Sequence, residues 1–205
     1  MKIVSFALIM PLISCTPIKS TLINQYKLDT YERLAPHGQA LHRSILISQP
    51  DAMAGYQTEQ MVYVDKPFAF NTFVESTWIS SPANMLYPLL VQSFQQDKTF
   101  SAVISSPYND KVDYRLDTQI LALRQNFLVK PSVLELSVKI VLTRIEDSQV
   151  LGSQLIQERI PCGSDTPYGG VVAANKATQL LIQKIRHFAI QKIQQDTGYK
   201  HGQTT

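Results

Sequence analysis

A regular alternation of apolar and polar residues near the middle of the sequence sets the strongest limit on the fold. Apolar side chains occupy every second position from Leu134 to Leu142, and polar side chains fill most of the positions between them. A period of two is typical of a strand that buries one face and exposes the other, as in antiparallel sheets. We therefore expect a strand over residues 132–146, joined by a polar turn to a second strand over 149–160.

The order of the remaining elements predicts an α+β fold. The apolar phase shifts near Ile120 inside one long strand, which indicates a β-bulge there. Because only two helical patterns accompany many strands, we expect a largely antiparallel or mixed sheet with two main helices packed on it. Strands are expected over 26–29, 43–49, 60–65, 68–78, 101–105 and 113–127, a loop over 50–55, and helices over 82–96 and 168–195.

Three of these expected elements carry sequence signals that indicate their type, their start or their buried face. Ser81 followed by Pro82 is typical of a helix start, although Pro88 conflicts with the same helix because proline has no amide hydrogen to donate. The apolar residues of the 168–195 helix recur at helical spacing, so that this stripe should pack on the sheet. The stretch over 68–78 carries apolar residues at even positions, and this period of two is typical of a strand.

The amino terminus has the pattern of a lipoprotein signal. Lys2 precedes an apolar run over residues 3–13, which is too short to span a bilayer that needs about 20 residues. Ser14 and Cys15 then resemble the lipobox of bacterial lipoproteins, in which the thiol of the cysteine is acylated and becomes the first residue. An ordinary secretion signal or an N-terminal strand with a chance cysteine is the alternative. We expect a signal peptide over 1–14, a lipidated tether over 15–25, one periplasmic domain over 26–195, and a disordered tail over 196–205.

Charge and residue counts argue against several classes of protein. Nineteen lysines and arginines stand against 16 acidic residues without any basic run, which argues against nucleic-acid binding. Two cysteines, Cys15 and Cys162, cannot build a disulfide framework, and Cys162 is expected to be a small buried residue at the end of a strand. The four histidines lack the close spacing of a metal pair, and no nucleophile motif occurs. The chain is therefore expected to be non-catalytic, without a metal or cofactor.

A few residues remain as candidates for binding. Asp113, Arg115 and Asp117 share one face of a strand, which is more typical of a surface ion-pair ladder than of a ligand site. The pair Gly169–Gly170 precedes a helix, where loop flexibility or close packing explains it better than anion binding. Aromatic residues could instead form a partner-facing cluster, although core packing explains most of them equally well: Tyr56, Tyr63, Trp78, Tyr87 and Tyr108.

Together, these motifs resemble the ABC-type transport auxiliary lipoproteins, the family of the paraquat-inducible membrane-barrier lipoprotein. Each stretch is short, but their joint order along residues 26–190 carries the likeness, and Pro88 belongs to one of them. The stretches are Gly55–Tyr56 with Met61–Val62–Tyr63, Trp78 with residues 82–86 and 88–90, Asp113 to Asp117, and Gly169 to Asn175.

The resemblance implies a non-catalytic lipoprotein on the periplasmic face of the outer membrane. Such proteins act as auxiliary components of lipid or hydrophobic-solute transport, together with an MCE-domain protein and a permease or ABC transporter. Some members resemble ring-forming homo-oligomers, so a homo-oligomer is a further expectation. Thr16 in place of an aspartate after the cysteine favours the outer membrane. A lipoprotein regulator of cell-wall synthases is the alternative, and a periplasmic hydrolase is the third.

Overall fold

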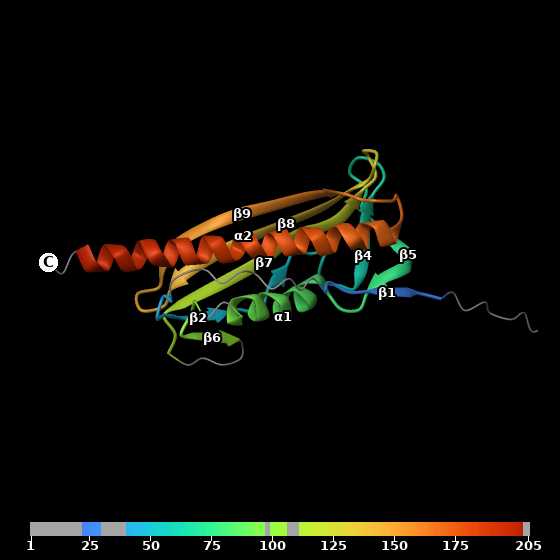
Figure 1. Ribbon diagram of the computed structural model, residues 1–205. Coiled ribbons are helices and arrows are strands. Elements are labelled where there is room, and N and C mark those ends of the chain that lie inside the picture. Colours follow the sequence, from blue (N-terminus) through green and yellow to red (C-terminus); the bar gives the residue numbers. More distant parts are fainter. Residues whose placement is uncertain (1–21, 30–39, 97–98, 106–110, 203–205) are drawn as a thin grey trace, which may run out of the picture.

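The computed structural model describes residues 22–29, 40–96, 99–105 and 111–202 of the 205-residue chain. Within these residues, nine strands form one mixed sheet, and two helices pack on it (Figure 1). This confirms the α+β fold with a mixed sheet. The elements are β1 (Asn24–Tyr26), β2 (Ser44–Ile47), β3 (Asp51–Ala52), β4 (Gln60–Val64), β5 (Asn71–Trp78), α1 (Pro82–Gln95), β6 (Ala102–Ser105), β7 (Tyr114–Asn126), β8 (Val133–Arg144), β9 (Gln149–Pro161) and α2 (Pro167–Gly202).

Strand β7 is the centre of the sheet. One of its edges pairs with β8 along nearly the whole strand, and β8 pairs with β9 in the predicted antiparallel hairpin. The other edge of β7 pairs in turn with β2, β3 and β4, all of them parallel to it. Strand β6 extends the sheet beyond β2, whereas β5 and then β1 extend it beyond β4.

The predicted bulge in β7 lies where the apolar phase changes. The pairing between β7 and β8 shifts by one residue between Ile120 and Ala122. Leu116 and Ile120 are buried before the shift, and Leu123 is buried after it. The extra residue therefore keeps apolar side chains of both phases on the covered face of one long strand.

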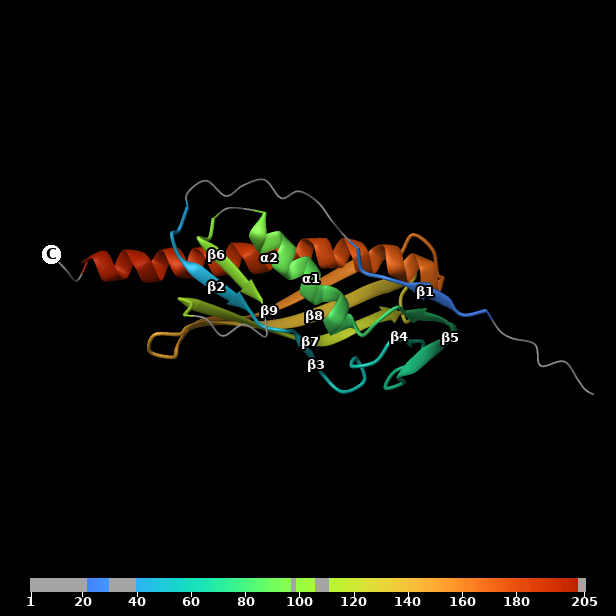
Figure 2. The same ribbon diagram turned by 90° about the horizontal axis from the view of Figure 1, so that it is seen from below.

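The two helices build the core on one face of the sheet (Figure 2). Helix α2 lies along β8 and β9 and also contacts α1. Its apolar stripe is buried as predicted, with Leu181 and Ile185 fully enclosed. In β8, the alternating residues Leu136, Val138 and Ile140 face this layer and are buried.

Helix α1 begins and continues as its sequence signals indicate. The Ser81 side chain accepts a hydrogen bond from the Asn84 amide at 3.4 Å, and Pro82 occupies the first turn. Pro88 lies inside the helix with its side chain exposed, so the ring is placed away from the core. The helix instead buries Leu86, Leu90 and other apolar residues of the opposite face.

Three expectations require correction. The expected loop over 50–55 contains the short strand β3, because β7 is long enough to pair with it between β2 and β4. Helix α2 continues to Gly202, so residues 196–202 are helical where a disordered tail was expected. The strand expected over 68–78 begins only at Asn71, and of its even-numbered apolar residues Trp78 is buried whereas Phe68, Phe70 and Val74 are exposed, because this part of the sheet lies near its edge and is covered only in part.

Candidate functional site

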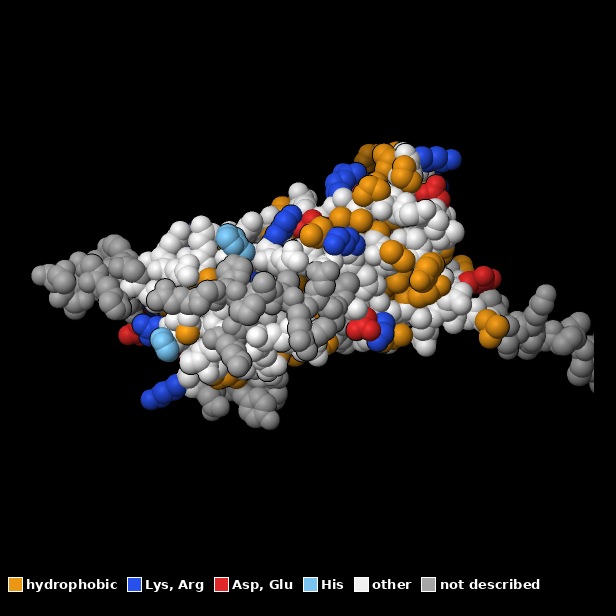
Figure 3. Space-filling view, in the orientation of Figure 1, with side chains coloured by type: hydrophobic (Ala, Val, Ile, Leu, Met, Phe, Trp, Pro, Cys, Tyr) orange, Lys and Arg blue, Asp and Glu red, His pale blue; other side chains and the backbone are white. Residues whose placement is uncertain are grey.

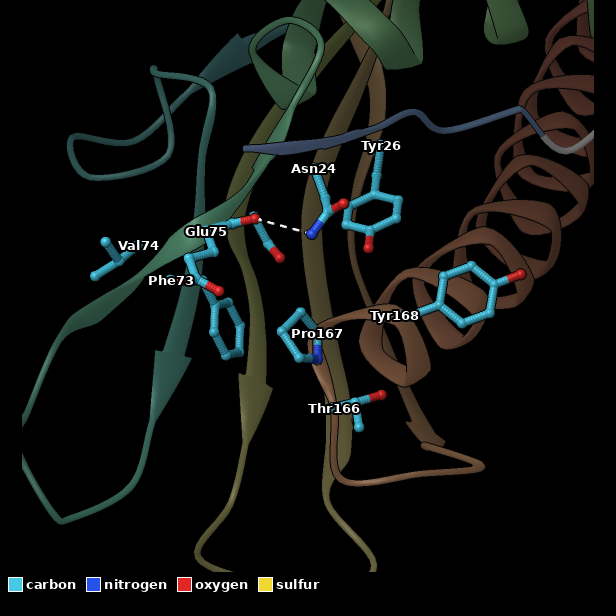
Figure 4. Close-up of a pocket in the computed structure, with 9 residues that line it drawn as sticks. Asn24, Tyr26, Phe73, Val74, Glu75, Thr166, Pro167 and Tyr168 are labelled. Carbon is cyan, nitrogen blue, oxygen red and sulfur yellow. Dashed lines mark hydrogen bonds between the residues drawn. The ribbon is translucent and has the colours of Figure 1, made fainter. Parts of the chain in front are cut away.

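A groove opens where the edge of the sheet meets the first turn of α2 (Figure 4). It has a volume of about 610 Å³. One wall comes from β1 and β5, and the other comes from the segment that enters α2. Its lining residues are Asn24, Tyr26, Phe73, Val74, Glu75, Ser76, Thr166, Pro167 and Tyr168.

The groove borders a stretch of backbone that no described strand covers. Strand β1 pairs with β5 only through Ser76, Thr77 and Trp78. Within the described part of the chain, the outer edge of β5 over 71–75 therefore has no strand partner. The Asn24 side-chain amide donates to the Glu75 carbonyl at 3.2 Å, which satisfies one group of this edge. The other backbone groups can accept an additional extended segment.

Aromatic rings form the apolar walls of the groove. Tyr26 and Tyr168 approach each other with ring centroids 6.0 Å apart. Figure 4 shows the Phe73 ring facing Pro167 across the groove, whereas Val74 points away. Tyr63 supports Phe73 from the neighbouring strand, with centroids 4.5 Å apart. This combination of apolar walls and open backbone is suited to binding an extended chain.

A partly buried hydrogen-bond network fixes the segment that leads into α2. The Asp165 carboxylate accepts from the Ser132 amide at 2.7 Å, and this hydrogen bond lowers the pKa of Asp165. Gln125 donates to the Ser132 hydroxyl at 2.8 Å and to the Thr166 carbonyl at 3.2 Å. The start of α2, and with it the aromatic wall at Tyr168, is thereby held against β7 and β8.

Close packing, one of the two explanations left open by the sequence, accounts for the glycine pair, which lies in the first turn of α2 and not before it. A Cβ at Gly170 would lie 2.4 Å from Oε1 of Gln125, and a Cβ at Gly169 would lie 2.1 Å from the Ser164 carbonyl oxygen. Both distances are too short for any side chain. The pair therefore allows the helix to begin directly on top of the buried Gln125.

Asn175 positions the segment that follows β1, a role that its place in the sequence does not indicate. Its side-chain oxygen accepts from the Asp29 amide at 2.7 Å, and its nitrogen donates to the carbonyls of Lys27 and Val171 at 3.2 and 3.0 Å. These bonds hold the segment after β1 against the second turn of α2. A side chain that satisfies backbone groups more than 140 positions away leaves no local sequence pattern.

The predicted aromatic residues do not form one exposed cluster. Trp78 and Tyr56 are 3% and 8% exposed and belong to the core, and burial raises the pKa of Tyr56. Tyr63 is half-buried next to the groove, and the half-buried Tyr87 donates to the Ile47 carbonyl at 3.4 Å. Tyr108 lies outside the described residues, as does the predicted lipidation site at Cys15.

The remaining candidates have structural roles in the described fold. Arg115 and Asp117 form an exposed ion pair at 2.9 Å, in line with the predicted ladder. Asp113 instead binds β2 by accepting from the Ser44 amide and hydroxyl, both at 2.7 Å. Burial raises the pKa of Asp113, but the hydrogen bonds from Ser44 and the charge of Arg43 outweigh it and leave this pKa below its usual value.

Cys162 follows β9 and is 2% exposed, as expected for a small buried residue. In the described part of the chain, no cluster of three or more histidine, cysteine or acidic side chains could hold a metal ion. None of the helices within these ranges has the length and apolar character needed to cross a membrane.

Solved structures with the same fold come from several bacteria. Protein XCC0632 from Xanthomonas campestris superimposes with a TM-score of 0.76 at 16% identity, over 85% of this chain and 99% of that one. An uncharacterised protein gives a TM-score of 0.61 at 13% identity, over 83% and 98% of the two chains. The hypothetical protein CT253 from Chlamydia trachomatis gives 0.50 at 8% identity, over 76% and 98%. At these identities the similarity shows the fold alone.

Sequence comparison gives the family directly. None of the curated proteins matches the chain at a significant level. The family model described as the ABC-type transport auxiliary lipoprotein component matches residues 26–186, from β1 through most of α2, and includes every residue that lines the groove except Asn24. The chain therefore belongs to the family of ABC-type transport auxiliary lipoprotein components.

Proposed function

We propose that this protein is a non-catalytic lipoprotein on the periplasmic face of the outer membrane, where it serves an ABC- or MCE-type system that moves lipids or other hydrophobic solutes across the envelope. Acylation of Cys15, with palmitate among the attached chains, fixes the protein to the bilayer. Residues 15–25 connect this anchor to the domain. A ring-shaped homo-oligomer is compatible with this role.

One observation carries the proposal. The family match over residues 26–186 begins shortly after an amino terminus in which an apolar run, Ser14 and Cys15 stand in the register of a lipobox. The match describes a transport auxiliary component, and the lipobox supplies its attachment to the membrane. Two or more acyl chains hold a protein stably on a bilayer, whereas one chain gives only marginal binding.

The groove gives this protein a means of engaging its transport partner. An extended segment of the MCE-domain protein would add to the open edge of β5 over residues 71–75. Backbone hydrogen bonds would then supply affinity, and alternate side chains would lie against Phe73 and Tyr168. In this mechanism the protein positions its partner and carries out no reaction.

The anchor is tested by metabolic labelling with palmitate in a bacterial host. The wild type and Cys162→Ala should incorporate label and fractionate with the outer membrane, whereas Cys15→Ala should incorporate none. Thr16→Asp should keep the label and move the protein to the inner membrane. A wild-type protein without label, confirmed by its intact mass, would overturn the anchor.

The partner is tested with a photo-crosslinking amino acid at Tyr168, which is 61% exposed at the groove. The matched control carries the same group at Val150, which is 57% exposed on β9. We expect position 168 to capture an MCE-domain protein and position 150 not to do so. Capture of a cell-wall synthase at position 168 would overturn the transport role and favour the regulatory alternative.

A further inference from the structure

Two loops leave the sheet together at one end of the molecule. Val64 at the end of β4 pairs with Asn126 at the end of β7, and the Phe127 amide donates to the Val64 carbonyl at 2.8 Å. The loop over 65–70 and the loop over 127–132 therefore start from adjacent points. We call them together the apolar tip, for the side chains that they carry.

The apolar tip exposes large apolar side chains that the described fold does not cover. Phe68 is fully exposed, and Phe70, Leu128 and Val129 are 49%, 48% and 42% exposed. Phe68 also has a φ of 64°, a left-handed backbone conformation that a bulky side chain rarely adopts. Fully exposed phenylalanine on strained backbone does not contribute to the core, which indicates a role in contacts outside the chain.

The charges around the apolar tip favour a lipid surface as its binding partner. Both lysines of these loops are exposed: Lys66 lies two residues before Phe68, and Lys130 directly follows Val129. Figure 3 shows hydrophobic side chains gathered on the upper projection, with basic side chains on either side and an acidic side chain beside one of them. Apolar side chains flanked by lysines match the acyl boundary and the anionic headgroups of a bilayer.

The acidic groups of these loops are engaged within the fold. Asp65 accepts from the Asn71 side chain at 2.8 Å. Asp165, in the neighbouring segment before α2, accepts from the Ser132 amide at 2.7 Å, and the hydrogen bonds from Ser132, followed by the charge of Lys130, lower its pKa. Both carboxylates therefore have hydrogen-bond partners of their own. The two lysines remain exposed beside the apolar side chains, where they can meet phosphate groups.

A lipid anchor at the amino terminus would hold the end of the molecule that carries the apolar tip close to the membrane. In Figure 1, the segment that enters β1 arrives at the end of the molecule that carries the apolar tip, whereas α2 ends at the opposite side. Residues 15–23 are nine residues, which span at most about 32 Å when fully extended. A lipid on Cys15 therefore keeps this end, rather than the end of α2, close to the bilayer.

We propose that the apolar tip inserts Phe68, Leu128 and Val129 into the headgroup region of the membrane as a second attachment. This inference rests on the proposed function for the lipid at Cys15, which brings the tip to the surface. Two contacts, unlike a single flexible tether, fix the orientation of the domain. The groove at β5 and the carboxyl end of α2 then point in defined directions relative to the bilayer.

Tryptophan fluorescence of the lipidated protein in vesicles tests this insertion. Phe68→Trp and the control Val150→Trp are reconstituted in phosphatidylethanolamine and phosphatidylglycerol that carry brominated acyl chains, which quench indole rings at close range. The buried Trp78 contributes a constant background, which the parent protein measures. We expect a blue shift and several-fold stronger quenching for Phe68→Trp than for Val150→Trp.

A double variant tests the same membrane contact by protease accessibility. Phe68→Ser with Leu128→Ser should keep the wild-type melting temperature, because both side chains are exposed, and should make the domain more accessible to protease on vesicles. Equal quenching of Phe68→Trp and Val150→Trp would overturn the proposal. A photo-crosslinker at position 68 that captures a protein instead of lipid would also overturn it.

Separate measurements test the lipid anchor at Cys15 and the membrane insertion of the apolar tip. Flotation of the lipidated protein with vesicles reports only the anchor, and a protein that does not float contradicts the proposed function. In that case the same quenching is measured at high lipid concentration. Quenching of Phe68→Trp there would still support the tip, and its absence would refute it.

Discussion

The Tyr114 hydroxyl donates a hydrogen bond of 2.8 Å to the carboxylate of Asp196, which joins the first residue of β7 to a late turn of α2. Arg144 at the end of β8 binds the same carboxylate. The helix is thus held to the sheet beyond the point at which its apolar stripe ends. These bonds secure α2 just beyond Gln195, where the polar composition predicted disorder and the helix instead continues to Gly202.

Tyr114→Phe should destabilise the protein, because it removes a buried hydrogen bond to a charged group. The expected loss is about 1.5–3 kcal/mol in the free energy of unfolding, measured with urea. The exposed Tyr168→Phe is the matched control and should change this free energy by less than about 0.5 kcal/mol. A loss equal to that of the control would show that the bond to Asp196 does not stabilise the fold.

The same tyrosine predicts a loss of stability in alkaline solution. Burial, and then the hydrogen bond to Asp196, raise the pKa of Tyr114 above its usual value. A group whose pKa is raised by folding contributes stability below its unfolded pKa and loses it as the pH rises. The wild type should therefore lose stability above about pH 10, and Tyr114→Phe should show a smaller loss. Parallel profiles of the two proteins would contradict this assignment.

Gly170→Ala should destabilise the start of α2. The new methyl group would lie 2.4 Å from Oε1 of Gln125, which is 2% exposed and cannot move aside freely. Overpacking of this kind costs about 1–3 kcal/mol. Gly163→Ala is the control, because a Cβ there meets nothing within 4 Å. Thermal unfolding should separate the two variants, and equal melting temperatures would contradict the close approach.

Glu135 predicts how the protein responds to acid. Burial raises the pKa of Glu135, but hydrogen bonds from Asn126 and Arg124 and the charges of Arg124 and Arg159 outweigh it and lower this pKa. The resulting stability is present above the usual pKa of a glutamate, about 4.3, and is lost as the pH falls.

Glu135→Gln should therefore cost about 1 kcal/mol at pH 7, since the two arginines are partly exposed and screened. Below about pH 4 its stability should converge with that of the wild type. Chemical unfolding at a series of pH values measures both effects. Glu75→Gln, a change of an exposed carboxylate, should keep the wild-type profile. A difference between Glu135→Gln and the wild type that stays constant in acid would refute the role of this pKa.

Cys162 should report on opening of the fold. Burial raises the pKa of its thiol, and its side chain is 2% exposed, so little thiolate is available for reaction. A maleimide should modify the native protein slowly and the urea-unfolded protein quickly. In a Cys15→Ala background, Cys162 supplies the free thiol that is measured. Rapid modification of the native protein would show that the end of β9 opens locally.

Local patterns in the sequence predicted the elements that are regular over many residues. The alternation in β8, the phase shift at Ile120 and the stripe of α2 each report directly on which face is buried. The two-residue strand β3 lacked such a signal, because its pairing with Gln119 and Ile120 depends on the length of β7. Sequence alone therefore predicted the layers of the fold and missed one partner of its central strand.

The candidate site was much less accessible to sequence reasoning. Apolar periodicity predicted a strand over 68–78 but not the exposure of Phe68 and Val74, which depends on where the helical layer ends. The groove joins residues from β1, β5 and α2 that are up to about 140 positions apart in the sequence. The clamp by Asn175 and the packing of Gly170 on Gln125 are likewise visible only in three dimensions.

The double pairing of β7 has a consequence for how the molecule responds to local disturbance. Its two edges join the β8–β9 hairpin to the strands β2, β3 and β4, so neither half of the sheet can detach without breaking bonds to this strand. Its backbone amides should exchange with deuterium last, close to the rate set by global unfolding. The short outer strands β1 and β6, each paired along one edge only, can fray first. Local opening of the sheet is therefore expected at its outer strands, while β7 stays paired on both edges.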